Sequence, residues 1–178
     1  MQTTVREHAR SDHASTACSN CHMPHEGERR SHAFGEVRDP GFLRAHLRAD
    51  GEREGSIVRV TLAQSTPAHG FPTGDLFRRL EVGYEMRRDD GTRVAREARD
   101  LARHFVAVPG ESGRRLQRDD RVFDEPKTVE FELPRDLPTG AHVRWWVTYQ
   151  RVASVGTGTD PKDAIIESEV PLAEGDFP

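Results

Sequence analysis

Residues 18–22 constrain this chain more than any other stretch, because they contain both of its cysteines and a histidine directly after the second. They read CSNCH, which is the spacing CxxCH. Two thiols on one short turn can form thioethers with the two vinyl groups of a porphyrin, and the adjacent imidazole can bind the iron. The motif therefore predicts one covalently attached haem c per chain, with Cys18 and Cys21 as thioether residues and His22 as the proximal iron ligand.

Two other chemistries can be weighed against haem attachment. A structural zinc site needs four ligands, and the chain has no second pair of cysteines to supply them. A mixed site, made by the two cysteines and two other histidines, stays open as an alternative. A thioredoxin-like redox pair would follow an apolar strand in a βαβ unit, whereas the residues around 18–22 are polar.

Composition sets the limits for the rest of the chain. Of its 178 residues, 34% are hydrophobic and 31% are charged, so the core must be small and a thin two-layer β architecture suits it. The net charge of -4 is interspersed along the chain, which leaves no basic face for nucleic acid. No apolar run is long enough to cross a membrane, and we expect no transmembrane segment.

The expected location follows from the motif rather than from a leader. The first residues show no basic stretch followed by an apolar one, so no export signal is recognisable. Bacterial haem attachment to CxxCH takes place outside the cytoplasm. We therefore expect a periplasmic or extracellular protein, and interpret the chain as a mature form or as the C-terminal piece of a longer exported protein.

The first fifty residues differ in composition from the remainder. They hold six of the nine histidines and few aliphatic side chains, too few to bury a core of their own. A haem would provide the missing apolar surface. Asp39 and Pro40 predict a helix start with the helix over residues 41–49, and residues 51–55 are expected to form a linker. We thus predict a haem-binding segment at residues 1–50 and a β-sandwich domain at residues 56–178.

From residue 56 the hydrophobic pattern alternates with a period of two, which is typical of strands. An Asp-Asp-Gly turn at residues 89–91 predicts a hairpin. About seven short strands with turns between them predict a mainly β fold, an antiparallel immunoglobulin-like sandwich that follows the small helical and loop segment. At least one of Trp145 and Trp146 should lie in its core. The expected strands are residues 56–64, 80–88, 93–95, 104–108, 127–133, 143–152 and 164–170.

A loop rich in proline and glycine joins the first two expected strands. Residues 67–75 read PAHGFPTGD, which predicts an ordered turn that holds His69 in place. His69 could bind a backbone carbonyl there, or it could ligate the haem iron.

Four of these segments together resemble a known family. Residues 11–14 (SDHA), 18–24 (CSNCHMP), 31–34 (SHAF) and 69–74 (HGFPTG) are similar to the C-terminal portion of bacterial multihaem c-type cytochromes. Such proteins often carry CHMP after the thiols, SxHA upstream and a GHxFPTG loop before a β-domain. The resemblance covers most of residues 11–80. The chain departs from it by having a single CxxCH, so histidines that serve other haems in the family either have no haem here or reach one on a partner chain.

The sixth iron ligand is less constrained than the proximal one. Met23 cannot reach the opposite face of the ring from beside His22. The expected metal ligands are His22 and His32, with the distal candidates ranked His32, His69, His13 and then His8. We expect His25 and His46 to be solvated or to take part in packing, and His104 and His142 to be structural.

These features favour an electron carrier over an enzyme. Two axial histidines leave no open iron position, which suits electron transfer outside the cytoplasm to a redox partner protein or a neighbouring cytochrome subunit. One alternative is an assembly or docking module of a larger multihaem complex, homo- or hetero-oligomeric, whose spare histidines ligate neighbouring haems. Another is a five-coordinate haem enzyme or small-ligand binder, with His13 or His69 as a distal acid–base group.

Overall fold

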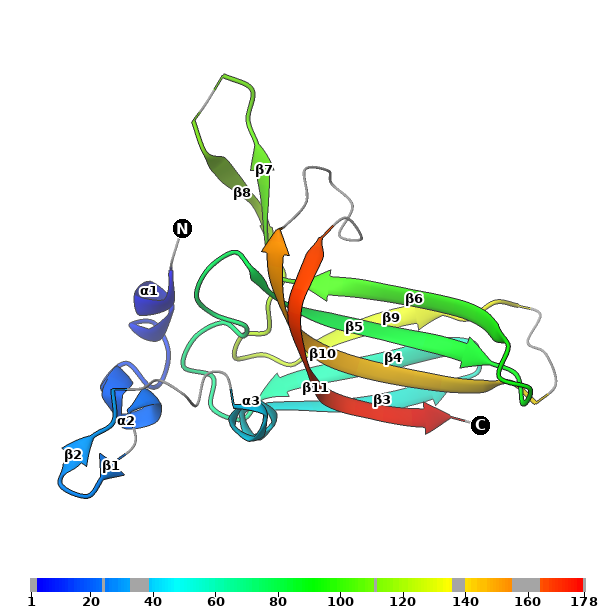
Figure 1. The fold of residues 1–178 in the computed structure, drawn as a ribbon, viewed down its shortest axis with the longest axis horizontal. Helices are drawn as coiled ribbons and strands as arrows, with labels where there is room; N and C mark the ends of the chain where they lie inside the picture. Colours follow the sequence, from blue (N-terminus) through cyan, green and yellow to red (C-terminus); the bar gives the residue numbers. More distant parts are fainter. Residues whose placement is uncertain are drawn as a thin grey trace.

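The computed structural model describes residues 3–23, 25–32, 39–110, 112–135, 140–154 and 164–177. Two five-residue helices and a tiny hairpin come first, followed by one longer helix and nine strands (Figure 1). In chain order these are α1 (Thr4–His8), α2 (Cys18–His22), β1 (His25–Glu26), β2 (Arg29–Arg30), α3 (Pro40–His46), β3 (Leu47–Glu54), β4 (Ile57–Gln64), β5 (Arg78–Arg87), β6 (Arg93–Leu101), β7 (Arg103–Ala107), β8 (Arg114–Asp119), β9 (Lys127–Glu132), β10 (His142–Ser154) and β11 (Ile165–Phe177).

Seven of the strands form two antiparallel sheets that face each other. One sheet has the order β11-β10-β5-β6 and the other the order β3-β4-β9. If the strands of the two sheets are lettered from β3 as A to β11 as G, these orders correspond to the G-F-C-C′ and A-B-E sheets of immunoglobulin-like folds. The prediction of a mainly β, antiparallel sandwich is confirmed.

The core lies between the two sheets. Val58, Val60 and Leu62 alternate along β4 and are fully buried, and the facing strands contribute aliphatic and aromatic side chains from the other layer. Each such side chain contributes about 1.5–3 kcal/mol by leaving water. Trp145 is 6% exposed, which confirms the expectation of a core tryptophan. The fully buried side chains include Val58, Val60, Leu62, Leu80, Val82, Met86, Phe131, Val143 and Val147.

Strand β3 corrects two expectations from the sequence. The helix ends at His46 rather than continuing to residue 49, and residues 51–54 pair with β4 instead of forming a linker. Gly51 suggested a break, but a Cβ placed there would lie 2.3 Å from the Trp145 ring. The glycine is needed because the indole lies directly on the backbone of β3.

The other expected strands are present: β5, β6, β10 and β11 are longer than predicted, whereas β7 is shifted by one residue and β9 ends one residue earlier. The β5–β6 hairpin turns at Gly91 as predicted, and β11 extends to Phe177, well past residue 170. Strand β8 was not expected, since all six of its residues are exposed and lack a hydrophobic alternation. It forms by pairing with β7 in a hairpin that projects from the sandwich (Figure 1).

The N-terminal residues lie beyond one end of the sandwich, beside α3 and the loop between β4 and β5 (Figure 1). Helix α3 begins where Asp39 accepts a hydrogen bond from the Phe42 amide at 2.8 Å, with Pro40 in the first turn. Across the described residues, no helix has the length and apolar character needed to cross a membrane. The division of the chain into segments 1–50 and 56–178 stays a prediction.

Candidate functional site

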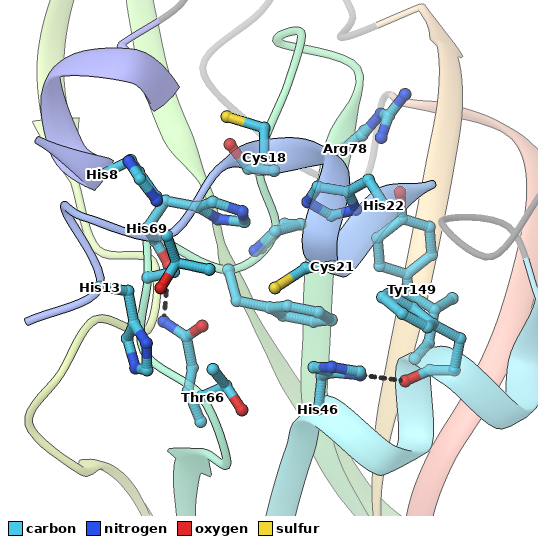
Figure 2. Close-up of a pocket in the computed structure, with 18 of the residues that line it drawn as sticks. His8, His13, Cys18, Cys21, His22, His46, Thr66, His69, Arg78 and Tyr149 are labelled. Carbon is cyan, nitrogen blue, oxygen red and sulfur yellow. Dashed lines mark hydrogen bonds between the residues drawn. The ribbon is translucent and has the colours of Figure 1, made fainter. Parts of the chain in front are cut away.

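A pocket lies where the N-terminal segment meets the end of the sandwich (Figure 2). Its empty volume is about 870 Å³ with its open mouth included. Both cysteines and five histidines line it, together with the apolar side chains of Phe42, Leu43, Phe71 and Pro72. The five histidines are His8, His13, His22, His46 and His69.

The CxxCH motif forms the short helix α2, and β2 holds its shape. Arg30 donates to the carbonyl oxygens of Ser19 and Met23, at 2.7 and 3.2 Å, and to the Asn20 side chain at 2.8 Å. One guanidinium therefore ties together the turn that carries both thiols. Cys18 and Cys21 are free and exposed, as thiols that receive a covalent group must be.

His22 and His69 face each other across the pocket. Their ring centres are 6.0 Å apart and their planes differ by 16°. Phe42 of α3 lies against His22 with ring centres 6.2 Å apart, and it packs on His46 at 4.1 Å. The His46 Nδ1 atom is 2.8 Å from the Phe42 carbonyl oxygen, an acceptor that requires the hydrogen on Nδ1.

Hydrogen bonds from the sandwich fix the loop that carries His69. Gln64, at the end of β4, donates to the His69 carbonyl at 2.9 Å and to the Val122 carbonyl at 2.9 Å. Phe71 and Val122 exchange two backbone hydrogen bonds of 2.8 and 3.0 Å. Because these hydrogen bonds hold the backbone at His69 and at Phe71, the β-domain sets the position of His69.

An ionic network around the buried Arg121 joins this loop to helix α1. Arg121 pairs with Glu7 at 2.6 Å and with Asp119 at 2.8 Å, and it donates to the Pro72 carbonyl at 3.3 Å. The Glu7 carboxylate also accepts from the Gly70 amide at 3.1 Å. Although burial opposes its ionisation, hydrogen bonds from Arg121, Thr3 and Gly70 lower the pKa of Glu7 overall.

The electrostatic environment keeps His69 neutral. Burial lowers the pKa of His69, and this outweighs the opposing effects of its hydrogen bond to Gly70 and of the Glu7 charge. A neutral imidazole is the form that binds a metal ion.

The structure brings together some of the predicted residues and separates others. Cys18, Cys21, His22, His69, His13 and His8 all line the pocket, whereas His32 is exposed and is not among the lining residues. His46, expected to be solvated or packing, packs on Phe42 at the pocket wall. In the β-domain, His104 and His142 lie 2.9 Å from Asp120 and Asp89; the second pair is exposed, and a structural role for both histidines stays a prediction.

Sequence reasoning missed the residues that shape and support the pocket. Phe42 was recognised only as part of a helix, and Arg121 and Glu7 belong to stretches with no motif. The sequence did show a glycine, Gly70, next to the candidate ligand His69. In the structure, a Cβ at Gly70 would lie within 2.9 Å of the Arg121 guanidinium. A glycine beside a candidate ligand marks close backbone approach.

Comparison with known proteins supports the fold. No protein-family model matches the chain, and no curated protein matches it by sequence. Among solved structures, a penta-haem cytochrome c552 from Thermochromatium tepidum is similar, with a TM-score of 0.69 and 19% identity. The match covers 97% of this chain and 49% of the cytochrome, so the chain spans about half of that protein's length.

Proposed function

We propose that this chain binds one haem c in the pocket through thioethers to Cys18 and Cys21, with His22 and His69 as the two axial iron ligands. The spacing of the two imidazoles carries the proposal. A metal ion held between two imidazoles needs two metal–nitrogen bonds of about 2 Å, and each ring centre lies roughly 1 Å beyond its nitrogen, which requires about 6 Å between ring centres. The rings of His22 and His69 are 6.0 Å apart and nearly parallel.

This proposal places His69 ahead of His32 as the distal ligand. His32 is exposed and outside the set of lining residues, whereas His69 is held opposite His22 by the β-domain loop. His13 also lines the pocket, and we rank His69 ahead of it because the rings of His22 and His69 are in contact. The β-domain would thus supply half of the axial coordination.

The residues of the pocket suit electron transfer. A haem, when bound, supplies a one-electron couple at its iron. His22 and His69 would hold the iron between them and would leave no iron position for a substrate. Phe42, Leu43 and Phe71 line the pocket with apolar surface, which would limit the access of water to a bound haem and the reorganisation that accompanies a change of charge. We therefore propose an electron carrier rather than an enzyme, acting in the periplasm or outside the cell with a redox partner protein.

An absorption spectrum of protein produced with a c-type haem maturation system tests the proposal. The protein should show a covalent, low-spin, six-coordinate haem that does not bind carbon monoxide readily. The variant H69A should become high-spin and bind carbon monoxide, whereas the matched variants H32A and H13A should keep the parent spectrum. If H32A becomes high-spin and H69A does not, His69 is not the ligand. Carbon monoxide binding by the parent protein would instead favour a five-coordinate ligand-binding or enzymatic site.

A second candidate is a module within a larger multihaem assembly. Two observations favour it: the chain spans 49% of the similar penta-haem cytochrome, and His8, His13 and His46 line the pocket in addition to the proposed ligands. In this case the additional histidines would ligate haems on neighbouring chain segments. The mass and the haem count of the native complex decide between the two, because a monomer with one haem excludes the module.

A further inference from the structure

Arg78, the first residue of β5, lines the pocket and is unusual among its neighbours (Figure 2). No other arginine or lysine occurs among the described lining residues. Its side chain is 20% exposed, and its Nε atom is buried with no hydrogen-bond partner in the described part of the structure. The Asp75 Oδ1 atom lies 3.8 Å from Nε, which is ion-pair range but too long for a hydrogen bond.

Tyr149 of β10 completes a pair of donors on the same wall. Its phenol interacts with Arg78 through a hydrogen bond, and burial raises the pKa of Tyr149 against the opposing charge of Arg78. The phenol is therefore protonated at neutral pH and can donate a hydrogen bond. A guanidinium beside a neutral phenol is a site for an anion, and the planar guanidinium matches a carboxylate best.

The surroundings narrow the choice of anion. Besides Arg78 and Tyr149, the pocket is lined by apolar and imidazole side chains together with three threonines, Gln64 and the two cysteines, so a charged substituent of a flat macrocycle would find no other arginine or lysine among the described lining residues. The buried Nε of Arg78 has lost its contact with water and gained no acceptor among the described residues, so an incoming carboxylate would offset this loss by accepting its hydrogen. The porphyrin of haem carries two propionate carboxylates at its edge.

We propose that Arg78 and Tyr149 form the binding site for a haem propionate carboxylate. This inference rests on the proposed haem function and adds an anchor to the thioethers and the axial histidines. It also predicts that Arg78 affects the reduction potential of the haem. A cation beside the haem edge stabilises the reduced form, so removal of the charge of Arg78 should lower the potential.

The test uses the haem-loaded protein with isotope-labelled propionates, followed by infrared spectroscopy over a pH series. The label separates the propionate from Asp75 and Tyr149, which interact with Arg78, and from the five histidines that line the pocket. In R78Q the propionate pKa should rise by about 1–3 pH units, as for a carboxylate that loses an adjacent arginine. R78K should restore part of the shift, and Y149F should show a smaller one. The control R48Q removes the same charge from an exposed arginine outside the pocket and should leave the propionate unchanged.

The outcomes separate this inference from the proposed function. A covalent low-spin haem whose propionate titrates identically in R78Q and the parent protein overturns the propionate site and leaves the haem site standing. Equal shifts in R78Q and R48Q also overturn it, because they indicate a general effect of net charge. A parent protein without covalent haem overturns both.

Discussion

Replacing Arg121 with methionine tests whether the ionic network behind the His69 loop stabilises the protein. Methionine has a similar length and no charge, so it removes the guanidinium while filling part of its volume. The change leaves Glu7 and Asp119 facing each other without their shared cation. It also removes the donor to the Pro72 carbonyl.

The burial of the three groups sets the expected magnitude. The side chain of Arg121 is 2% exposed, and those of Glu7 and Asp119 are 16% and 24% exposed. Removing one partner of a buried ion pair costs about 3–5 kcal/mol. Since both carboxylates retain some contact with water, we expect R121M to lower the free energy of unfolding by about 2–4 kcal/mol.

Urea unfolding followed by circular dichroism measures this loss. The matched control is R144M, which breaks the pair between Arg144 and Glu174, both 56% exposed, and should cost at most about 1 kcal/mol. A double-mutant cycle of R121M with E7Q should give a coupling free energy above about 1 kcal/mol, because the two side chains are in direct contact.

Equal effects of R121M and R144M would refute the reasoning, since the network would then behave like a surface ion pair. The haem-loaded protein gives an independent readout. Because Glu7 and Arg121 hold the backbone of the His69 loop, R121M should weaken distal ligation and increase the fraction of high-spin haem. An unchanged spectrum would show that Gln64 and the backbone bridge between Phe71 and Val122 hold the loop without the Arg121 network.

Three further predictions concern the packing on β3, the pH dependence of stability and the support of the α2 turn. G51A should lower the free energy of unfolding by about 1–3 kcal/mol, measured by urea unfolding, because the new methyl group overlaps the Trp145 ring. Burial, opposed by the charge of Arg79, raises the pKa of Asp100 to about 6. The folded state therefore holds this proton more tightly than the unfolded state, and stability should fall as the pH rises from 4 to 6; a thermal-unfolding pH series should lose this slope in D100N. R30M should destabilise the α2 turn by about 1 kcal/mol and lower the yield of covalent haem, measured by mass spectrometry, because it removes three hydrogen bonds. A full yield in R30M would show that the turn needs no support from β2.

Much of the β-domain could be predicted from the sequence. The alternating pattern of β4 and the turn at residues 89–91 depend on local sequence, and both appear where they were expected. The linker expected at residues 51–55 and the unexpected strand β8 were mispredicted because contacts with distant residues decide the local structure there. Gly51 lies inside β3 because a tryptophan from another sheet packs on it, and β8 exists only through its pairing with β7.

The residues of the candidate site also fall into two groups, those that the local sequence predicts and those that only the tertiary structure brings together. By itself, the sequence identified the two thiols and the adjacent His22 as the candidate attachment site, because the CxxCH spacing involves residues that are close in the chain. The opposing histidine could only be ranked, since ring-to-ring distance depends on how distant segments fold together. The tertiary structure brings His69 to 6.0 Å from His22, leaves His32 exposed, and gathers Arg78, Tyr149 and the Arg121 network around the pocket. These contacts join residues up to 114 positions apart, a separation at which no local pattern in the chain predicts a contact.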